Sequence, residues 1–125
     1  MLQTGKNKMP LINVNTAKKL SNETKNALQM ALAENISVFP EKTKEFLTVC
    51  IIDGCSMYKN EQVLDGAFFE VRIFRNTTEQ AKKEFTSRLF DIADRVLGVQ
   101  QDKININYIE FQDWGMRGVY KTASM

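Results

Sequence analysis

Histidine is absent from the 125 residues of this sequence, and cysteine, proline and tryptophan are rare. Without an imidazole, the usual Ser-His and Cys-His nucleophile systems are excluded, together with the commonest zinc ligand. The only cysteines, Cys50 and Cys55, form no Cys-x-x-Cys pair, and Cys50 lies in an apolar run, where we interpret it as a small core residue. We therefore predict no metal site and no cofactor, so any chemistry must come from Lys, Arg, Asp, Glu, Tyr, Asn or a terminal amine.

The sequence also lacks long apolar runs and blocks of like charge. No run approaches the length that crosses a bilayer, and residues 1–8 are polar, without the apolar centre of a secretory signal. The net charge of +2 is spread along the chain, which does not favour a nucleic-acid partner. We therefore expect a single cytoplasmic domain with neither a nucleic acid nor a membrane as its partner.

Hydrophobic periodicity divides the chain into two similar halves. In the first half, residues 11–15 predict a short strand, Ser21 is a suitable N-cap for a helix, and residues 46–52 predict a second strand. Between the strands, apolar residues recur at helical spacing at Leu28, Ala31, Leu32 and Ile36. The first half therefore has the order β-α-β.

The second half repeats this order. Residues 67–74 alternate as a strand does, and residues 104–111 predict a closing strand. Thr77 and Gln80 have the spacing of a capping box, and Gly98 is a typical C-cap. The helical stripe between them consists of Ala81, Phe85, Leu89, Ile92 and Val96.

Two β-α-β units predict an α+β fold, in which a four-stranded mixed sheet carries two helices on one face. Residues 55–66 are expected to link the halves as a hairpin or loop, and residues 114–125 to add a short edge strand that pairs with a neighbouring subunit. The second face of the sheet has no cover in a single chain. Closed symmetric association is the common solution, so we expect an oligomer.

Five segments of the sequence together resemble the tautomerase superfamily, in particular its macrophage migration inhibitory factor (phenylpyruvate tautomerase)-like branch. The similarity runs from Met9 to about Gly118. It implies the tautomerase/MIF-like fold in a homotrimeric barrel. It also implies a keto–enol tautomerase, an isomerase that acts on small 2-oxo acids such as phenylpyruvate-type substrates. The segments are residues 9–16, 53–58, 69–74, 102–108 and 113–115.

Pro10 is the catalytic residue that the resemblance implies. In the family, a proline that has become the N-terminus acts as general base or acid and moves a proton between carbon atoms. In this sequence Pro10 is internal, where its nitrogen is an amide without basicity. We interpret residues 1–9 as an N-terminal extension or a mis-assigned start, and residues 10–125 as a single tautomerase/MIF-like domain. From position alone, a proline that merely begins a strand is the commoner interpretation.

Lys42, Phe74 and Arg75 are the first group of substrate-binding candidates. The resemblance implies that Lys42 binds the substrate carboxylate and helps to keep the proline neutral, although Lys44 is close enough to be confused with it. It also implies that Phe74 lines an apolar pocket. Arg75 suits a carboxylate because its guanidinium can bind both oxygens. The alternatives are an exposed loop lysine, a core phenylalanine and a solvated arginine.

Asn105 and Asn107 are the second group. They lie two apart on a predicted strand and therefore share one face of it. The resemblance implies that Asn107 donates its amide to a ligand bound to the adjacent subunit. Asn105 stands where the mammalian proteins have a tyrosine, which makes the pocket more polar. Both could equally be solvated positions of an alternating strand.

Two other functions compete with the tautomerase. A non-catalytic MIF-like trimer could serve as a binding or signalling surface, and a genuine N-terminal extension would favour it. A decarboxylase or hydratase that uses Arg72 or Arg75 is the third hypothesis, although these arginines lack the close spacing and the companion acidic residues that we would expect of such a site.

Overall fold

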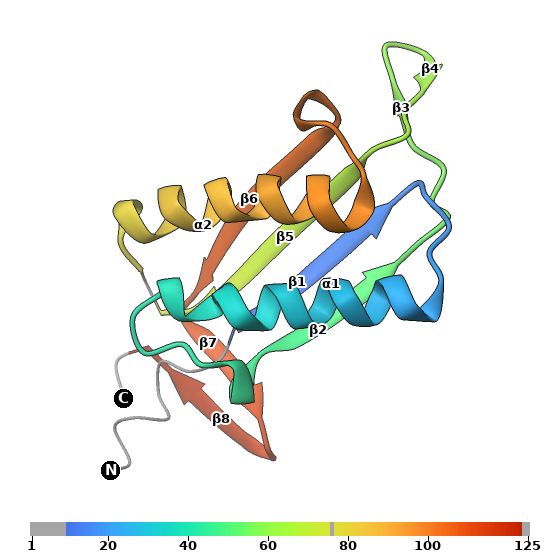
Figure 1. Ribbon diagram of the computed structural model, residues 1–125. Helices are drawn as coiled ribbons and strands as arrows, with labels where there is room; N and C mark the ends of the chain where they lie inside the picture. The colour runs from blue at the N-terminus through green and yellow to red at the C-terminus, as the bar shows by residue number, and fades with distance from the viewer. Residues whose placement is uncertain (1–9, 76, 124–125) are drawn as a thin grey trace.

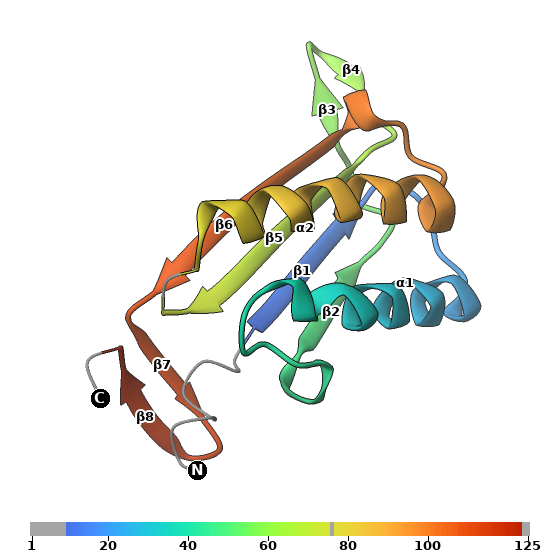
Figure 2. The ribbon, with the colours of Figure 1, turned by 60° about the vertical axis from the view of Figure 1, so that its left-hand side comes forward.

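The chain forms the predicted pair of β-α-β units (Figure 1). The computed structural model describes residues 10–75 and 77–123. Each unit contributes two strands to one four-stranded sheet, and both helices cover the same face of it (Figure 2). The α+β fold class expected from the sequence is therefore confirmed. The main elements are β1 (Pro10–Thr16), α1 (Asn22–Asn35), β2 (Thr48–Ile52), β5 (Ala67–Phe74), α2 (Glu79–Ile92) and β6 (Ile104–Phe111).

The strand order of the sheet is β2-β1-β5-β6. β1 pairs in parallel with β2, and β5 pairs in parallel with β6, while the two central strands β1 and β5 are antiparallel. Because of this central pairing, the start of β1 lies at the same end of the sheet as the ends of β5 and β6. Pro10 is opposite Ile73 on β5, and Ile73 is opposite Glu110 on β6. The sheet topology therefore brings together residues that are far apart in the sequence.

The core lies between the sheet and the two helices. On β5, the alternating residues Phe69, Val71 and Ile73 face the helices and are fully buried, as their spacing predicts. Phe39, which follows α1, packs on Phe85 of α2 with ring centroids 4.8 Å apart. The predicted helical stripes are buried at Leu28, Leu32, Ile36, Ala81, Phe85, Leu89 and Ile92, and Ala31 and Val96 pack against this core.

Each main helix has a side-chain cap at its N-terminus. The Ser21 hydroxyl accepts a 3.0 Å hydrogen bond from the Thr24 backbone N–H, as the sequence predicts. In α2 the cap is Thr78, whose Oγ1 accepts from the Ala81 N–H at 3.1 Å. The prediction of Thr77 as the cap is therefore wrong by one residue. The Thr77 N–H instead donates to the Glu110 carboxylate at 3.0 Å, which keeps Thr77 in the preceding turn.

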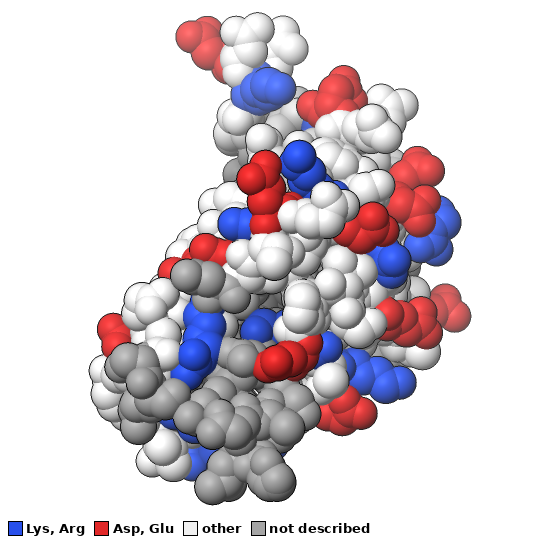
Figure 3. All heavy atoms as spheres, turned by 90° about the vertical axis from the view of Figure 1, so that its left-hand side faces the viewer, with Lys and Arg blue, Asp and Glu red and all other residues white. Residues whose placement is uncertain are grey.

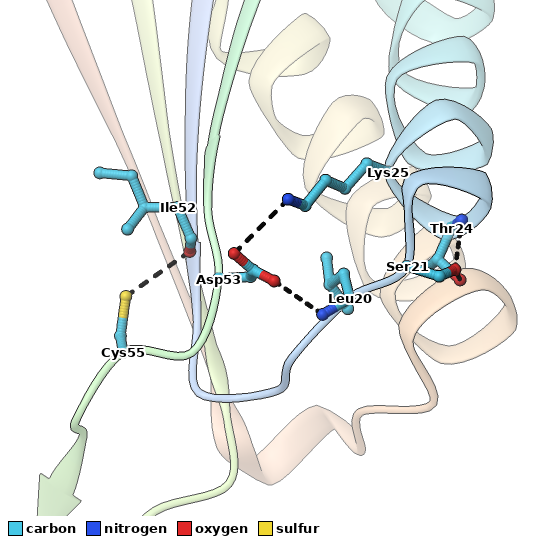
Figure 4. Close-up of polar contacts among 7 residues, drawn as sticks. All are labelled: Leu20, Ser21, Thr24, Lys25, Ile52, Asp53 and Cys55. Atoms are coloured by element: carbon cyan, nitrogen blue, oxygen red, sulfur yellow. Dashed lines mark hydrogen bonds and ion pairs between the residues drawn. The ribbon is translucent and has the colours of Figure 1, made fainter.

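The sheet and α1 are also joined at the opposite end, where β2 ends in the predicted Asp53-Gly54 turn (Figure 4). One Asp53 oxygen accepts from the Leu20 N–H at 2.8 Å, and the other lies 3.6 Å from the Lys25 ammonium. The Leu20 N–H is the main cause that holds the pKa of Asp53 below its usual value. This carboxylate therefore ties the end of β2 to the start of α1.

Two short hairpins lie at opposite ends of the sheet (Figures 1 and 2). β3 (Tyr58–Lys59) and β4 (Gln62–Val63) form a hairpin between the two halves, where the sequence predicted a hairpin or a loop. The tail was expected to be a single edge strand, but β7 (Asp113–Met116) pairs with β8 (Val119–Thr122) of the same chain. Its pairing with a neighbouring subunit stays a prediction.

Short helical turns complete the described chain. The turn Lys44–Phe46 delays the start of β2 to Thr48, two residues after the predicted start of the strand. A π-helical turn, Ala93–Leu97, continues α2 and ends at Gly98, whose φ of 68° gives the left-handed C-cap that the sequence predicts. The other turns are the 3-10 segments Ile36–Val38 and Gln101–Lys103.

The face of the sheet opposite the helices is open in the single chain. Cys50 is exposed on this face, so its interpretation as a core residue is wrong. The apolar run around Cys50 forms the edge strand β2, in which alternate side chains point away from the helices.

Within residues 10–75 and 77–123, no helix has the length and apolar character that a bilayer crossing requires.

Candidate functional site

A cavity of about 630 Å³ lies at the end of the sheet where β1 begins and β5 ends. Its walls come from the loop after α1, from the turn between β5 and α2, and from the two ends of the β7–β8 hairpin. Figure 3 shows this end of the molecule, where Lys and Arg atoms are interspersed with Asp and Glu atoms. The described lining of the cavity is Pro40, Glu41, Lys42, Arg75, Thr77, Thr78, Gln112 and Ala123.

Lys42 is the most deeply buried charged residue of this cavity, with 3% of its surface exposed. Its backbone N–H donates to the Phe39 carbonyl at 3.1 Å, which fixes the turn after α1. Burial of the amine lowers the pKa of Lys42 to about 8, while the Glu41 carboxylate opposes this shift and the Arg75 cation adds to it. Lys44 is exposed on the following turn, so the structure separates the two lysines that the sequence left ambiguous.

Arg75 enters the cavity because the chain leaves β5 at this residue. Its φ of 71° is in the left-handed region, and its backbone N–H donates to the Phe111 carbonyl at 2.7 Å. Its guanidinium carbon lies 5.6 Å from the centre of the Phe74 ring. Lys42 and Arg75, which are 33 positions apart in the sequence, thus line one cavity.

Pro10 lies at the same end of the sheet, as the first residue of β1. It is buried, and its register partner on β5 is Ile73, two positions before Arg75. Pro10 itself does not belong to the described lining of the cavity. The predicted boundary at residues 1–9 lies outside the described residues.

Phe74 is fully buried, but it does not belong to the core between the sheet and the helices. Its ring packs against Trp114 of β7 at a centroid distance of 6.2 Å, and Trp114 also contacts Phe111 at 5.6 Å. The β7–β8 hairpin therefore covers Phe74. The contact with Arg75 places this aromatic group directly beside the cavity.

Asn105 and Asn107 lie on the open face of β6, as their spacing predicts, and both are exposed. With Phe68 and the base of the β3–β4 hairpin they line a second cavity of about 570 Å³. Asn105 is opposite Phe68 and Asn107 is opposite Glu70, well before the end of β5. Within one chain, therefore, the two asparagines do not share a cavity with Lys42 and Arg75.

Arg72 belongs to neither cavity lining. It lies on the open face, 3.4 Å from the Glu70 carboxylate and over the Phe111 ring at 5.7 Å. The two arginines considered for a decarboxylase or hydratase therefore have different surroundings, and only Arg75 lines the first cavity.

Several residues of the first cavity were not predicted as site residues. Thr78 lines it as the N-cap of α2, and Gln112 lines it from the start of the β7–β8 hairpin. Thr78 could have been predicted from the sequence, because a helix N-cap only three positions after Arg75 indicates a site for an anion. Nothing in the sequence indicates Gln112, because its position in the cavity depends on how residues 112–123 fold back on the sheet.

The comparisons with known proteins agree on one fold. The sequence model described as macrophage migration inhibitory factor (MIF) matches residues 9–122. No curated protein sequence gives a significant match. The structure of MIF2 from Leishmania major has a TM-score of 0.84 and 16% identity, over 91% of this chain and 98% of that chain.

Two further solved structures widen this comparison. Pt0534, solved after inactivation by 2-oxo-3-pentynoate, has a TM-score of 0.76 and 18% identity, over 92% of this chain and 98% of that chain. A fused 4-OT, solved as an asymmetric trimer, has a TM-score of 0.78 and 18% identity, over 91% of this chain and 96% of that chain. At such identities these structures establish the fold alone.

The fold thus defines the class of the molecule: two β-α-β units on one mixed sheet, an arrangement shared with these solved structures. The match to the sequence model covers nearly the whole chain. The chain belongs to the macrophage migration inhibitory factor (MIF) family.

Proposed function

We propose that this chain is a keto–enol tautomerase of small 2-oxo acids, such as phenylpyruvate-type substrates, and that Pro10 is its general base and acid once residues 1–9 are removed. The observation that carries the proposal is the position of Pro10. It is buried at the start of β1, at the same end of the sheet as the cavity with Lys42 and Arg75.

The chemistry requires a free secondary amine. While Pro10 is joined to Met9, its nitrogen is an amide that neither accepts nor releases a proton. As an N-terminus, the amine would be partly desolvated and would lie at the same end of the sheet as Lys42 and Arg75, and burial and nearby positive charge both favour its neutral form. A neutral amine near physiological pH can take a proton from the carbon next to a carbonyl and return it elsewhere.

The cavity would hold the substrate by its carboxylate. Lys42 and Arg75 supply two positive charges against the single carboxylate of Glu41. Phe74 is fully buried and outside the described lining, so its part would be to hold the Arg75 guanidinium against its ring. A 2-oxo acid as substrate is also supported by Pt0534, whose fold this chain shares and which was solved after inactivation by 2-oxo-3-pentynoate. No cofactor is needed for this proton transfer.

A homotrimer is part of the proposal, because Asn105 and Asn107 lie away from the first cavity of their own chain. In a closed trimer they would face the cavity of an adjacent subunit and donate hydrogen bonds to its ligand. The open sheet face and the trimer reported for a fused 4-OT support this arrangement.

The free thiols of Cys50 and Cys55 are compatible with the cytoplasmic location that we expect.

The test is enol-to-keto turnover of several 2-oxo acids by protein that begins at Pro10. We expect Pro10→Gly, a primary amine of different basicity, to lower kcat/KM by roughly 100-fold or more, the usual effect of a lost general base. Protein that begins at Met1 should be inactive and serves as a matched control. Equal turnover by all three forms would reject the proposal, and the mass of the native protein would show which N-terminus exists.

The second candidate is a non-catalytic MIF-like trimer that acts as a binding or signalling surface. The exposed apolar side chains of the β3–β4 hairpin favour it, since Tyr58 is 69% exposed and Val63 is 78% exposed. A trimer that lacks turnover in every N-terminal form would support this function. Turnover that depends on Pro10 would reject it as the sole function.

A further inference from the structure

Lys42 and Arg75 differ in the chemistry that their charges allow. A guanidinium stays protonated at any physiological pH, so Arg75 can only bind an anion. An amine that is buried close to this cation can lose its proton and become a nucleophile. The cavity therefore combines a permanent carboxylate receptor with a group capable of covalent chemistry.

We propose that Lys42 forms a reversible imine with the carbonyl carbon of a small 2-oxo acid whose carboxylate is bound by Arg75. This activity goes beyond the proposed tautomerase. It does not require Pro10 to be a free amine, and it uses Lys42 as a nucleophile instead of a cation.

The location of Lys42 is the first support. The residue lines a cavity of about 630 Å³ and is only 3% exposed, so it belongs to the cavity wall and is shielded from bulk solvent. By contrast, Lys44 is exposed two positions later. A small oxo acid that enters the cavity thus meets one buried lysine.

The charges around Lys42 are the second support. The charged groups of the cavity lining, within the described residues, are Glu41, Lys42 and Arg75. Burial and Arg75 lower the pKa of Lys42 to about 8 against the opposing effect of Glu41. At pH 7 roughly a tenth of such an amine is neutral, against fewer than about one in a thousand for an ordinary lysine. Imine formation should therefore rise as the pH approaches 8.

The position of Arg75 is the third support. Its backbone is held by the 2.7 Å hydrogen bond to Phe111, and its guanidinium lies over the Phe74 ring. Arg75 lines the same cavity as Lys42, where its guanidinium can bind a carboxylate. In a 2-oxo acid the carbonyl carbon is bonded directly to the carboxylate carbon, so a bound carboxylate keeps the reactive carbon within the cavity.

The reaction is balanced without any further reagent. The nitrogen lone pair of the neutral Lys42 attacks the carbonyl carbon, and a carbon–nitrogen bond forms. The carbonyl oxygen leaves as water with the two protons of the amine, and a C=N double bond remains. Addition of water reverses the sequence and regenerates both partners.

Reductive trapping tests the proposal. The full chain, in which Pro10 is part of an amide, is incubated with pyruvate and cyanoborohydride, and the adduct is located by peptide mass mapping. We expect Lys42 to be modified at least about tenfold faster than any exposed lysine, because of its larger neutral fraction. Lys42→Arg should abolish this adduct, whereas the matched variant Lys44→Arg should leave it unchanged.

A second comparison tests the role of Arg75. The ratio of Lys42 modification by pyruvate to that by acetone, which has no carboxylate, should fall at least about tenfold in Arg75→Gln. The ratio is used because loss of Arg75 also changes the basicity of Lys42 for both reagents. Circular dichroism and thermal unfolding identify any variant that fails to fold. The location of the adduct on the wild-type chain does not depend on the variants, so it tests the proposal in either case.

Adducts spread over the exposed lysines, or an unmodified Lys42 up to pH 9, would overturn the proposal. This result is separate from the fate of the tautomerase, which is measured on protein that begins at Pro10. An adduct on a free Pro10 would be found on a different peptide from an adduct on Lys42. The Lys42 imine and the Pro10 tautomerase can therefore be rejected independently.

Discussion

Lys42 illustrates, at the scale of one residue, how the fold changes the chemistry of a common side chain. In the unfolded chain its amine is fully hydrated and has an ordinary pKa. Folding buries it beside Arg75 and lowers that pKa to about 8. Below pH 8 the folded protein must therefore hold a poorly solvated cation, which opposes folding.

This cost gives a prediction about Lys42→Met. Between pH 8 and about 10.5 the unfolded state binds more protons at this position than the folded state, so the contribution of Lys42 to stability rises with pH. At pH 7 we expect the variant to increase the free energy of unfolding by about 1 to 3 kcal/mol. At pH 10 this gain should shrink towards zero.

Urea denaturation of both proteins at pH 7 and pH 10 measures the effect. Lys44→Met is the matched control, since Lys44 is exposed and should give the same small change at both pH values. A gain for Lys42→Met that does not depend on pH would mean that better packing, and not the lost charge, is its cause.

At the scale of elements, the start of α2 shows how a local pattern and a tertiary contact compete. Both Thr77 and Thr78 are good N-cap residues, and the spacing of Thr77 to Gln80 favours a cap at Thr77. The Glu110 carboxylate on β6 accepts the Thr77 N–H, which holds that residue in the turn. The helix therefore starts one residue later than its own sequence suggests.

The paired variants Thr78→Val and Thr77→Val test this assignment. Valine keeps the shape of threonine but has no hydroxyl, so Thr78→Val should lower the free energy of unfolding by about 1 kcal/mol through loss of the cap. Thr77→Val should be neutral or slightly stabilising, because the Thr77 hydroxyl is buried without a hydrogen-bond partner. Thermal or urea denaturation measures both variants. If Thr77 were the cap, Thr77→Val would be the less stable of the two.

At the scale of the whole molecule, the β3–β4 hairpin projects beyond the sheet and presents apolar groups to solvent (Figures 1 and 2). Tyr58 and Val63 on this hairpin contribute nothing to the core between the helices and the sheet. Their exposure in one chain is explained if a neighbouring chain covers them in the proposed trimer.

Tyr58→Asp tests this explanation. A carboxylate placed in a subunit contact would have to be desolvated, so we expect sedimentation at micromolar concentration to show monomers where the wild type shows trimers. The matched control is Met30→Asp on the outer surface of α1, where Met30 is 49% exposed. Dissociation by both variants, or by neither, would remove the hairpin from the proposed interface.

The sequence predicted the elements well where local rules act alone. The cap at Ser21, the left-handed Gly98 and the alternation of residues 67–74 each depend on a few neighbouring side chains. The errors at Cys50 and Thr77 have a different origin. Each depends on the position of its strand or turn within the sheet, which a linear pattern does not contain.

By itself, therefore, the sequence determined the two β-α-β units, because their hydrophobic periods are set by backbone geometry. It also supplied the candidates Pro10, Lys42, Phe74, Arg75, Asn105 and Asn107, through its resemblance to a known family. Only the tertiary structure decided which of them meet. The antiparallel pairing of β1 with β5 brings Pro10 to the end of the sheet where Lys42 and Arg75 line one cavity, while Asn105 and Asn107 line another. Burial and proximity between distant segments also set the pKa of Lys42, and neither exists until the chain has folded.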